Sequence, residues 1–348
     1  MARITLDDVA KKAGVSFKTV SRVLNNEYGV SEETTEKVKK AIAELNYVPN
    51  TAARSLSRGK ARAIGLVIGW PVTSPYSTAM IEETLKESMH YGYSLALFSL
   101  DHGSSKRIID ACIGRQVDGL ILDTVASENV SLAGQLNAMN IPCVVVHPNR
   151  KENYPKASFV QIDNIEAAKQ AVSYLLALGH RAIGFICADI GLNQEDDRYD
   201  GYQKAFADAG IPLNKEWSFY GGGWTPEHSF GYGFAGTMHL LSTHKEITAL
   251  FAETDEIAMG IVSAIWQMGL KVPDDISVVG FDDIMFASMI APPLTTIHQP
   301  VDEIIRISVE HLIGMIDGNE HTPIDMILPT RLIVRETCKP PRRKEVEQ

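Results

Sequence analysis

Cysteine is scarce in this sequence of 348 residues, which has four, at positions 112, 143, 187 and 338. They are scattered through mostly apolar, strand-like runs, which favours small core residues in a reducing compartment over disulfides or a metal site. Apolar runs of membrane-spanning length are also missing, and no signal peptide precedes Thr5. We therefore expect a cytoplasmic protein without a membrane partner.

Motifs of the common enzyme classes are missing as well. There is no HExxH, GxSxG or paired-cysteine motif, and the ten histidines are dispersed without metal-ligand spacing on one helix face. The glycine run before Trp224 lacks the strand–GxGxxG–helix arrangement of a dinucleotide site and the lysine of a P-loop. Asp282 and Asp283 are adjacent, and because adjacent side chains usually point apart, they are better interpreted as hydrogen-bond acceptors than as an acid–base pair. The sequence predicts no enzyme, no cofactor and no metal.

The net charge of −10 is divided unevenly along the chain. Residues 1–62 hold 12 Lys and Arg against 7 Asp and Glu, whereas the remainder holds 21 against 36. A cationic segment on an anionic body is typical of a phosphate-binding module attached to a domain that avoids nucleic acid. The length and the 45% hydrophobic content suit a small head on a two-lobed globular body.

The cationic segment shows three short amphipathic periods. Thr5, Ser16 and Ser31 each precede one and can cap a helix, while Gly14 can end the first helix because it lacks a Cβ. The predicted inward-facing side chains are Leu6, Val9, Ala10 and Ala13 in the first helix, Val20, Val23 and Leu24 in the second, and Val38, Ile42 and Leu45 in the third. A helix, a tight glycine turn and a second helix with polar outward side chains form the helix-turn-helix pattern, whose second helix reads the major groove.

Candidate DNA contacts follow from this pattern. The candidate base contacts on the outward face of the second helix are Phe17, Lys18, Ser21, Arg22 and Asn25. Exposed cations are usually only solvated, but their shared face with polar neighbours favours contact with DNA, where Arg can bind guanine through two hydrogen bonds. The candidate phosphate contacts, several of them also helix caps, are Thr5, Ser16, Thr19, Ser31, Thr34 and Asn50.

The same residues resemble the head of the lac repressor (LacI/GalR) family of bacterial transcription regulators. The runs TLDDVAKKAGVSFKTVSRVLN, ELNYVPN and ARSL follow that family's pattern almost position for position. The resemblance implies that Phe17, Lys18 and Arg22 carry operator specificity. It continues in the body through the runs VQIDN, LGHRAIGFI, RYDGYQKAF, FAETDEIAMG and VPDDISVVGFDDIMFASMIAPPLTTIHQP.

Residues 49–62 join the head to the body. About nine of them precede Gly59, and because a helix that short is marginal in water, composition alone favours a plain basic linker. The resemblance implies instead a hinge helix that is ordered only when two copies meet on DNA. In that helix the small side chain of Ala53 would permit the two copies to approach each other closely. Leu56 would insert into the minor groove and bend the duplex.

From Ala63 onward, strand-like apolar runs alternate with helical segments across short Gly or Pro turns, which is typical of parallel, doubly wound sheets. Helices are expected at 81–91, 108–116, 130–139, 165–178, 199–209, 226–241 and 256–268, and strands from 63, 93, 118, 141, 158, 180, 217, 247 and 276. Two such series in tandem predict two lobes with a ligand cleft beyond the carboxyl ends of the strands.

The predicted fold is therefore a small all-α helix-turn-helix head plus an α/β two-lobed core of two doubly wound parallel sheets. For the core, the resemblance implies the fold of the periplasmic sugar-binding proteins, with three chain crossings between the lobes. The expected limits are 1–48 for the head, 49–62 for the hinge, 63–338 for the core and 339–348 for a tail. Within the core, the expected N-lobe is 63–160 plus 298–326, and the C-lobe is 161–297 plus 327–338.

The resemblance also implies a set of effector contacts in the cleft. Arg198 matches the arginine that holds effector oxygens, Asp282 matches a carboxylate that accepts from ligand hydroxyls, and Thr254 stands where the family usually has Asn. Aromatic walls and forked polar partners suit a sugar. The full candidate set is Tyr76, Ser77, His147, Arg198, Trp224, Thr254 and Asp282.

Structural alternatives exist for several of these residues. Arg198 could pair with Asp196 or Asp197 at the surface, Trp224 could lie in the core, and His147 could pack at a strand end. Asp255 is predicted to cap the helix that begins at Glu256.

The sequence as a whole predicts a regulator that represses a carbohydrate transport or catabolism operon. It would bind a palindromic operator as a homodimer, and a small sugar or sugar derivative between the lobes would control it. The alternative is the same architecture responding to a purine or nucleoside corepressor.

Overall fold

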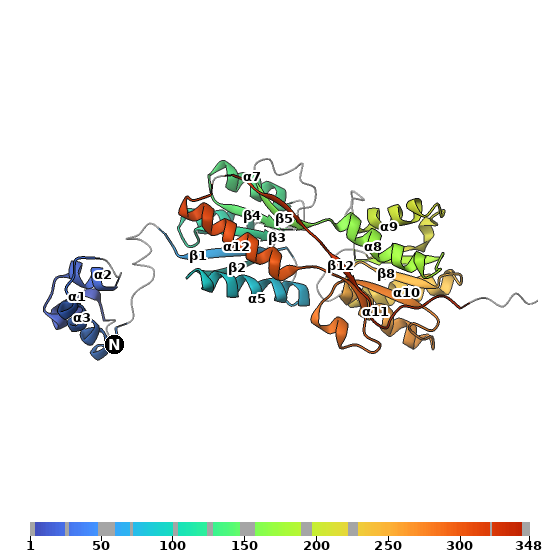
Figure 1. Ribbon diagram of the computed structural model, residues 1–348, viewed down its shortest axis with the longest axis horizontal. Helices are drawn as coiled ribbons and strands as arrows, with labels where there is room; N and C mark the ends of the chain where they lie inside the picture. Colours follow the sequence, from blue (N-terminus) through green and yellow to red (C-terminus); the bar gives the residue numbers. More distant parts are fainter. Residues whose placement is uncertain are drawn as a thin grey trace, which may run out of the picture. The chain divides into compact units, whose positions relative to one another are not determined.

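The computed structural model describes residues 4–24, 28–47, 60–69, 72–99, 104–123, 128–146, 157–188, 197–221, 229–320 and 322–342. The chain divides into two compact units, Met1–Ala61 and Arg62–Gln348. The first is a small helical head and the second an α/β core (Figure 1). None of the helices among these residues combines the length and the apolar character needed to cross a membrane.

The head consists of three helices, α1 (Leu6–Ala13), α2 (Phe17–Leu24) and α3 (Glu32–Glu44). The Thr5 hydroxyl accepts from the Asp8 amide, the Asp8 carboxylate accepts from the Thr5 amide, and Gly14 ends α1 at φ +68°. Ser16 accepts from the Thr19 amide at 3.1 Å, and Ser31 caps α3. These caps confirm the predicted helix starts, because each satisfies an amide that the first turn leaves without a helical partner.

A single apolar cluster holds the three head helices together. Val9, Val20 and Val38, one from each helix, are completely buried, and Ala10, Ala41 and Tyr47 complete the cluster. The predicted inward faces are thereby confirmed. The opposite face of α2 does not belong to this apolar cluster.

The N-lobe of the core is a parallel six-stranded sheet in the order β11-β5-β4-β3-β1-β2. Its strands are β1 (Ala63–Ile68), β2 (Ser94–Ser99), β3 (Gly119–Asp123), β4 (Cys143–Val146), β5 (Ser158–Ile162) and β11 (Asp325–Leu328). Its helices are α5 (Pro75–His90), α6 (Ser104–Ile113), α7 (Glu128–Ala138) and α12 (Val301–Asp317). Helices α5 and α12 lie side by side against this sheet (Figure 1).

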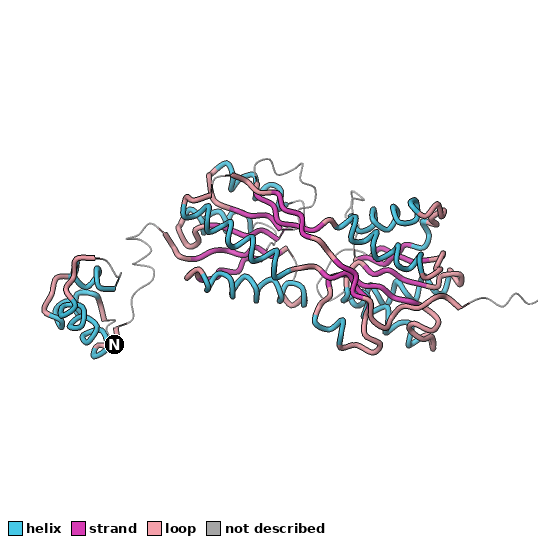
Figure 2. Tube along the Cα trace, in the orientation of Figure 1, coloured by secondary structure: helices cyan, strands magenta, loops and turns pink. Residues whose placement is uncertain are grey.

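The C-lobe is a second six-stranded sheet in the order β12-β10-β9-β8-β6-β7. Its strands are β6 (Ile183–Cys187), β7 (Ser218–Tyr220), β8 (Ala249–Ala252), β9 (Ser277–Asp282), β10 (Thr295–His298) and β12 (Arg331–Ile333). Its helices are α8 (Asn164–Ala177), α9 (Asp197–Asp208), α10 (Ser229–Thr243) and α11 (Asp255–Gln267), with short 3-10 turns η2 (Lys215–Trp217) and η3 (Met285–Ser288). The pairs α8–α9 and α10–α11 cover this sheet (Figure 2).

The chain passes between the two sheets three times. It leaves the N-lobe through Asp163 between β5 and α8, returns through residues 299–300 between β10 and α12, and crosses again through residues 329–330 between β11 and β12. Three crossings place the carboxyl ends of both sheets at the junction of the lobes, which is where ligands bind in sheets of this kind. The predicted head and two-lobed core are confirmed.

Three details differ from the sequence prediction. Helix α5 begins at Pro75 rather than at residue 81, since Pro at the first helical position needs no amide partner and its fixed φ already suits a helix. Strand β12 runs antiparallel to β10, so the C-lobe sheet is not wholly parallel. Residues 339–342, assigned to a tail, still contact the C-lobe, where Lys339 O accepts from His180 Nε2 at 2.9 Å and Arg342 pairs with Asp275 at 2.9 Å.

Helices α10 and α11 pack at the closest distance that their backbones allow. A Cβ on Gly233 would lie 2.0 Å from Ile257 O, and a Cβ on Gly260 would lie 2.0 Å from Phe230 O. Because the obstructing atoms belong to the backbone, no rotamer change can relieve the overlap.

We expect Gly260→Ala to lower the free energy of unfolding by about 3 kcal/mol, at the upper end of overpacking costs, as measured by denaturant titration. The matched control is Gly231→Ala on α10, where nothing lies within 4 Å of an added Cβ. That control should gain up to about 1 kcal/mol, because alanine loses less backbone entropy in a helix than glycine. Equal effects of the two substitutions would contradict the close-packing explanation.

Candidate DNA-binding surface and effector site

The outward face of α2 carries four of the five predicted base contacts. Phe17 is 52% exposed, Lys18 is exposed, and Ser21 and Arg22 are half-buried. Together, the exposed Phe17 ring and the neighbouring cations suit a helix that enters a groove of DNA, where the ring can contact a thymine methyl group.

The predicted phosphate contacts lie at the first turns of the helices. Thr19 Oγ1 lies 2.9 Å from Ser16 Oγ, and Thr34 Oγ1 lies 2.9 Å from Ser31 Oγ. Thr5 caps α1. Each first turn concentrates amide N–H groups and the positive end of the helix dipole, so it favours a bound phosphate.

Six predicted site residues lie outside the described residues. They are Asn25, Asn50, Ala53, Leu56, His147 and Trp224.

A cavity of about 500 Å³ lies between the lobes. Tyr76, Thr78 and Glu82 of α5 line one side, and Asp282, Met285 and Gln299 line the other. It therefore joins two predicted effector contacts, Tyr76 and Asp282, which are far apart in the sequence. Ser77, next to Tyr76, is fully buried and does not line this cavity.

Asp282 stands at the end of β9 on an unusual backbone. Its φ is +115° and that of Asp283 is +59°, both in a region that side chains with a Cβ rarely adopt. Gln299 Nε2 donates to Asp282 Oδ1 at 2.7 Å. Strained non-glycine residues of this kind persist only where their surroundings hold them, and they concentrate at ligand sites.

Arg198 of α9 lies beside Asp282, with 3.7 Å between Nη1 and Oδ1. Its Nε donates to Asn164 Oδ1 at 3.1 Å, its Nη1 donates to Glu253 O at 2.5 Å, and the guanidinium lies 3.8 Å from the centre of the Phe281 ring. Only 18% of its side chain is exposed. Since these contacts fix the guanidinium plane next to the carboxylate, the interpretation of Arg198 as a surface ion-pair residue has less support than its role in the cleft.

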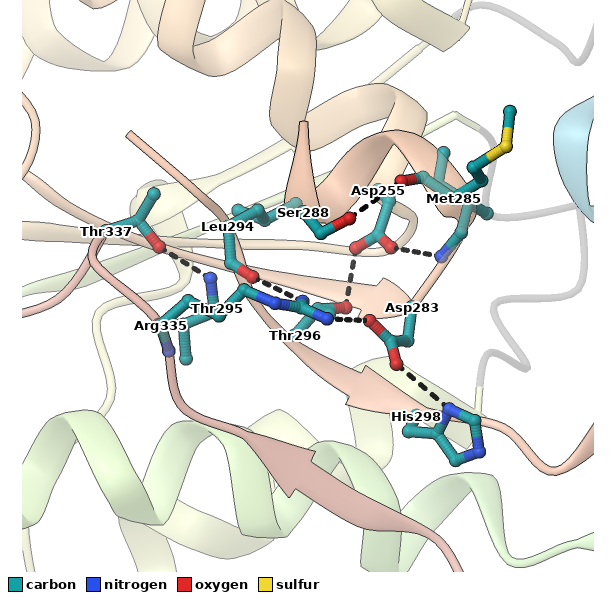
Figure 3. A network of polar contacts seen from close by, with 11 residues as sticks. Asp255, Asp283, Met285, Ser288, Leu294, Thr295, Thr296, His298, Arg335 and Thr337 are labelled. Carbon is teal, nitrogen blue, oxygen red and sulfur yellow. Dashed lines mark hydrogen bonds and ion pairs between the residues drawn. The ribbon is translucent and has the colours of Figure 1, made fainter. Parts of the chain in front are cut away.

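The turn at residues 282–284 is held from behind by Asp255. This completely buried carboxyl accepts from the Ile284 amide at 2.9 Å and from the Thr296 hydroxyl at 2.6 Å (Figure 3). Burial raises the pKa of Asp255 well above its usual range, and the charge of Asp282 raises it further. The prediction that Asp255 caps α11 is wrong: the cap is Thr254, whose hydroxyl accepts from the Ile257 amide, because the cap residue directly precedes the first turn that contains Asp255.

Asp283 is fixed by Arg335 and His298. Arg335 Nη2 lies 2.6 Å from one of its oxygens and His298 Nδ1 lies 3.0 Å from the other (Figure 3). Arg335 also donates to Leu294 O at 2.8 Å. Both carboxylates line the cavity, but Asp283 is bound by Arg335 and His298, whereas Asp282 accepts from Gln299 and lies beside Arg198.

Asp123 is a buried carboxyl near Tyr76 that the sequence prediction did not single out. It is the last residue of β3, opposite Ile68 of β1, and is completely buried. It therefore lies at the carboxyl end of the N-lobe sheet, the end that faces the other lobe. Burial is the largest cause of the raised pKa of Tyr76; the charges of Asp123 and Asp282 raise it further, while Arg198 lowers it. The run DGLILD carries no signal of this proximity to Tyr76 other than its place at a strand end.

Ser74 and Glu256 form a hydrogen bond directly between the lobes. Ser74 stands at the N-cap position of α5 without capping it, and its hydroxyl instead donates to Glu256 Oε2 on α11 at 2.9 Å. Burial raises the pKa of Glu256 and this hydrogen bond lowers it.

This geometry defines a class of protein. A head whose described residues form three helices with a helix-turn-helix surface is joined to a two-lobed α/β core with a cavity between the lobes. Residues 5–50 match the family described as bacterial regulatory proteins, lacI family, and residues 172–338 match the periplasmic binding protein-like domain.

Comparison with known proteins agrees over almost the whole chain. The HTH-type transcriptional repressor PurR of Glaesserella parasuis serovar 5 (strain SH0165) is 34% identical over 343 residues, which are 96% of this chain and 98% of the relative. The chain belongs to the lacI family of bacterial regulatory proteins. It is a helix-turn-helix transcriptional regulator and not an enzyme.

Two solved structures share the complete architecture. The transcriptional regulator CelR–cellobiose complex has a TM-score of 0.71 and 30% identity, covering 96% of this chain and all of that one. The lac repressor dimer bound to operator and the anti-inducer ONPF has a TM-score of 0.84 and 28% identity, covering 97% of this chain and all of that one.

Proposed function

We propose that this protein represses a carbohydrate transport or catabolism operon. It binds a roughly palindromic operator as a homodimer, and a small sugar-like effector between the two lobes controls that binding. The observation that carries the proposal is one chain that combines a recognition helix bearing Lys18 and Arg22 with an interlobe cavity that carboxylate and tyrosine side chains help to line. The protein acts in the cytoplasm, where operator DNA is found.

On the DNA side, Phe17, Lys18, Ser21 and Arg22 contact base edges, together with Asn25. Arg22 and Lys18 offer donors to guanine, and the Phe17 ring offers apolar contact to a thymine methyl group. Thr5, Ser16, Thr19, Ser31 and Thr34, with Asn50, contact phosphates and fix the register. Ala53 and Leu56 of the hinge, residues 49–62, meet their partners in the second subunit at the minor groove.

On the effector side, Tyr76, Arg198 and Asp282 form the centre of the site, and His147, Trp224 and Thr254 complete it, whereas the buried Ser77 does not line the cavity. An aromatic wall with a carboxylate and a guanidinium suits the apolar face and the hydroxyls of a sugar. The cellobiose complex of a regulator that is similar over 96% of this chain supports a carbohydrate. A purine or nucleoside corepressor has no such support.

Effector binding changes how the two lobes lie relative to each other, because its contacts come from both. The N-lobe carries residues 49–62 with it, so the separation of two hinge segments in a dimer changes. A coupling free energy of about 1–3 kcal/mol between the two sites is sufficient for regulation. The functional units are the head at 1–48, the hinge at 49–62 and the core from residue 63.

The test is selection of operator DNA from a random duplex library with the full-length protein, followed by footprinting. We expect a site of two related half-sites, and release or tightening of that site by at least one member of a carbohydrate panel. Selection of no sequence, or of a site without twofold symmetry, would contradict the proposal. A response to nucleobases and to no carbohydrate would contradict the proposed class of effector, but the protein would still be a transcriptional regulator.

A further inference from the structure

We propose that Arg62 is a positioning residue, which fixes the direction in which the hinge joins the N-lobe. The two hinges of a dimer then fit one spacing of operator half-sites. This inference rests on the proposed function, because it concerns how the same hinge, residues 49–62, is held on the operator.

Arg62 is the first residue of the core unit and directly precedes β1. Its φ is +56°, in the left-handed region that a residue with a Cβ rarely adopts. The other described non-glycine residues with positive φ either follow the end of a helix, where that conformation is common, or belong to the turn at the cavity; they are Asn46, Arg115, Asn140, Asp282 and Asp283. Arg62 follows no helix that the structure describes, so its conformation needs another cause.

The backbone hydrogen bonds of Arg62 supply that cause. Its N–H donates to Asp118 Oδ2 at 2.7 Å, directly before β3, and its C=O accepts from the Ser94 amide at 2.9 Å, at the start of β2. In an extended strand the N–H and C=O of one residue point to the same neighbouring strand. Strands β3 and β2 flank β1 on opposite sides. The chain therefore has to turn at Arg62 in order to bind both.

Two further contacts hold the same point. The Asp118 amide donates to Ala63 O at 2.8 Å, so the residues before β3 and at the start of β1 are bound twice. The Arg62 guanidinium lies 5.5 Å from the centre of the ring of Tyr93, which is buried and directly precedes β2. Arg62 is thus attached through its backbone and its side chain to both neighbouring strands.

A strained residue persists only where its surroundings hold it, and such residues are common at switch regions. Since three strands of the N-lobe hold Arg62, no free joint separates that lobe from the start of the hinge. The twofold axis of a dimer relates two such exits, and hinges that leave in fixed directions match one separation of half-sites. A rotation of the N-lobes on effector binding is passed to both hinges instead of being absorbed at residue 62.

The test measures how strictly the full-length protein requires one spacing between half-sites. Its affinity is compared for the selected operator and for the same duplex with a base pair inserted or removed at its centre. We expect the wild type to prefer the selected spacing by about tenfold or more, and Asp118→Ala, which removes the acceptor of the Arg62 amide, to prefer it by about threefold or less. Asp118→Asn keeps a side-chain oxygen that accepts, so it should retain the wild-type ratio.

Arg115→Gly is the matched control. It removes an arginine with a φ of +51° after α6 in the same lobe, and Arg115 takes no part in the contacts of Arg62 described above. Its ratio should equal that of the wild type. Arg62→Gly replaces Asp118→Ala if that variant fails to fold. Glycine adopts many backbone conformations and lacks the contact with Tyr93, so the ratio should fall in this variant as well.

Equal affinity of the wild type for all three spacings overturns the proposal and leaves the regulator intact. An unchanged ratio in Asp118→Ala, or in Arg62→Gly where it takes its place, overturns the anchoring role of these contacts. An equal fall in Asp118→Asn overturns the role of the hydrogen bond, and an equal fall in Arg115→Gly would reflect general loosening of the lobe and overturns the proposal too. Failure to select any operator removes the proposed function, and with it this inference.

Discussion

Replacement of Arg22 by alanine is expected to abolish discrimination between operator and random DNA. Each bidentate contact of arginine with guanine contributes about 1–3 kcal/mol of discrimination, so the two heads of a dimer lose about 2–6 kcal/mol. Binding that rests on phosphates persists, because its charge contacts are spread over the head. The measurement is the ratio of specific to non-specific dissociation constants on the selected operator, as a function of salt.

Effector binding should be unaffected by this substitution, because Arg22 lies in the head unit and the interlobe cavity lies in the core unit. Lys40→Ala is the matched control, since Lys40 is an exposed cation on α3 outside the recognition helix. It should weaken operator and random DNA about equally. Loss of effector affinity in Arg22→Ala, or unchanged discrimination, would show that α2 does not read bases.

Replacement of Arg198 by alanine is expected to remove the effector response while operator binding remains. The substitution removes the charge partner of Asp282 at 3.7 Å and the donors to Glu253 O and Asn164, all within one buried group of contacts. Removing one member of a buried charge pair costs about 2–5 kcal/mol, which corresponds to roughly a 30-fold or greater loss of effector affinity. The measurement is the concentration of the active sugar that changes operator occupancy by half.

Arg181→Ala controls for the general cost of removing an arginine from the C-lobe. Arg181 donates to Leu176 O and His180 O and makes no contact with the cavity. Its removal should lower stability modestly and leave the effector response in place. If Arg198→Ala still responds at the wild-type concentration, the effector site lies elsewhere.

The head was predictable from sequence because its signals are local. A cap such as Thr5, an apolar stripe such as Val9 and Val20, and a left-handed glycine at position 14 all act within one or two turns of helix. The alternation of strands and helices in the core was predictable for the same reason. The early start of α5 was missed because the expected helix relied on apolar period alone, whereas Pro75 at the first helical position is itself a start signal.

The site was less predictable because its contacts join distant residues. Asp255 looks like a helix cap from its neighbours alone, and only the arrival of Ile284 and Thr296 turns it into the support of the Asp282 turn. Gln299 carries no local motif, and it reaches the cavity because the 299–300 crossing passes between the lobes there. Resemblance to a family placed Arg198 and Asp282 in the same cleft, which spacing could not do.

The Ser74 hydroxyl can form a hydrogen bond with either of two partners, depending on how the lobes lie. In the arrangement described here, this hydroxyl donates to Glu256 on the other lobe, so the first turn of α5 has no side-chain cap from Ser74. Once the lobes separate, the same oxygen is released to accept from an amide of its own helix. We therefore expect opening to replace one hydrogen bond with another rather than simply to lose one.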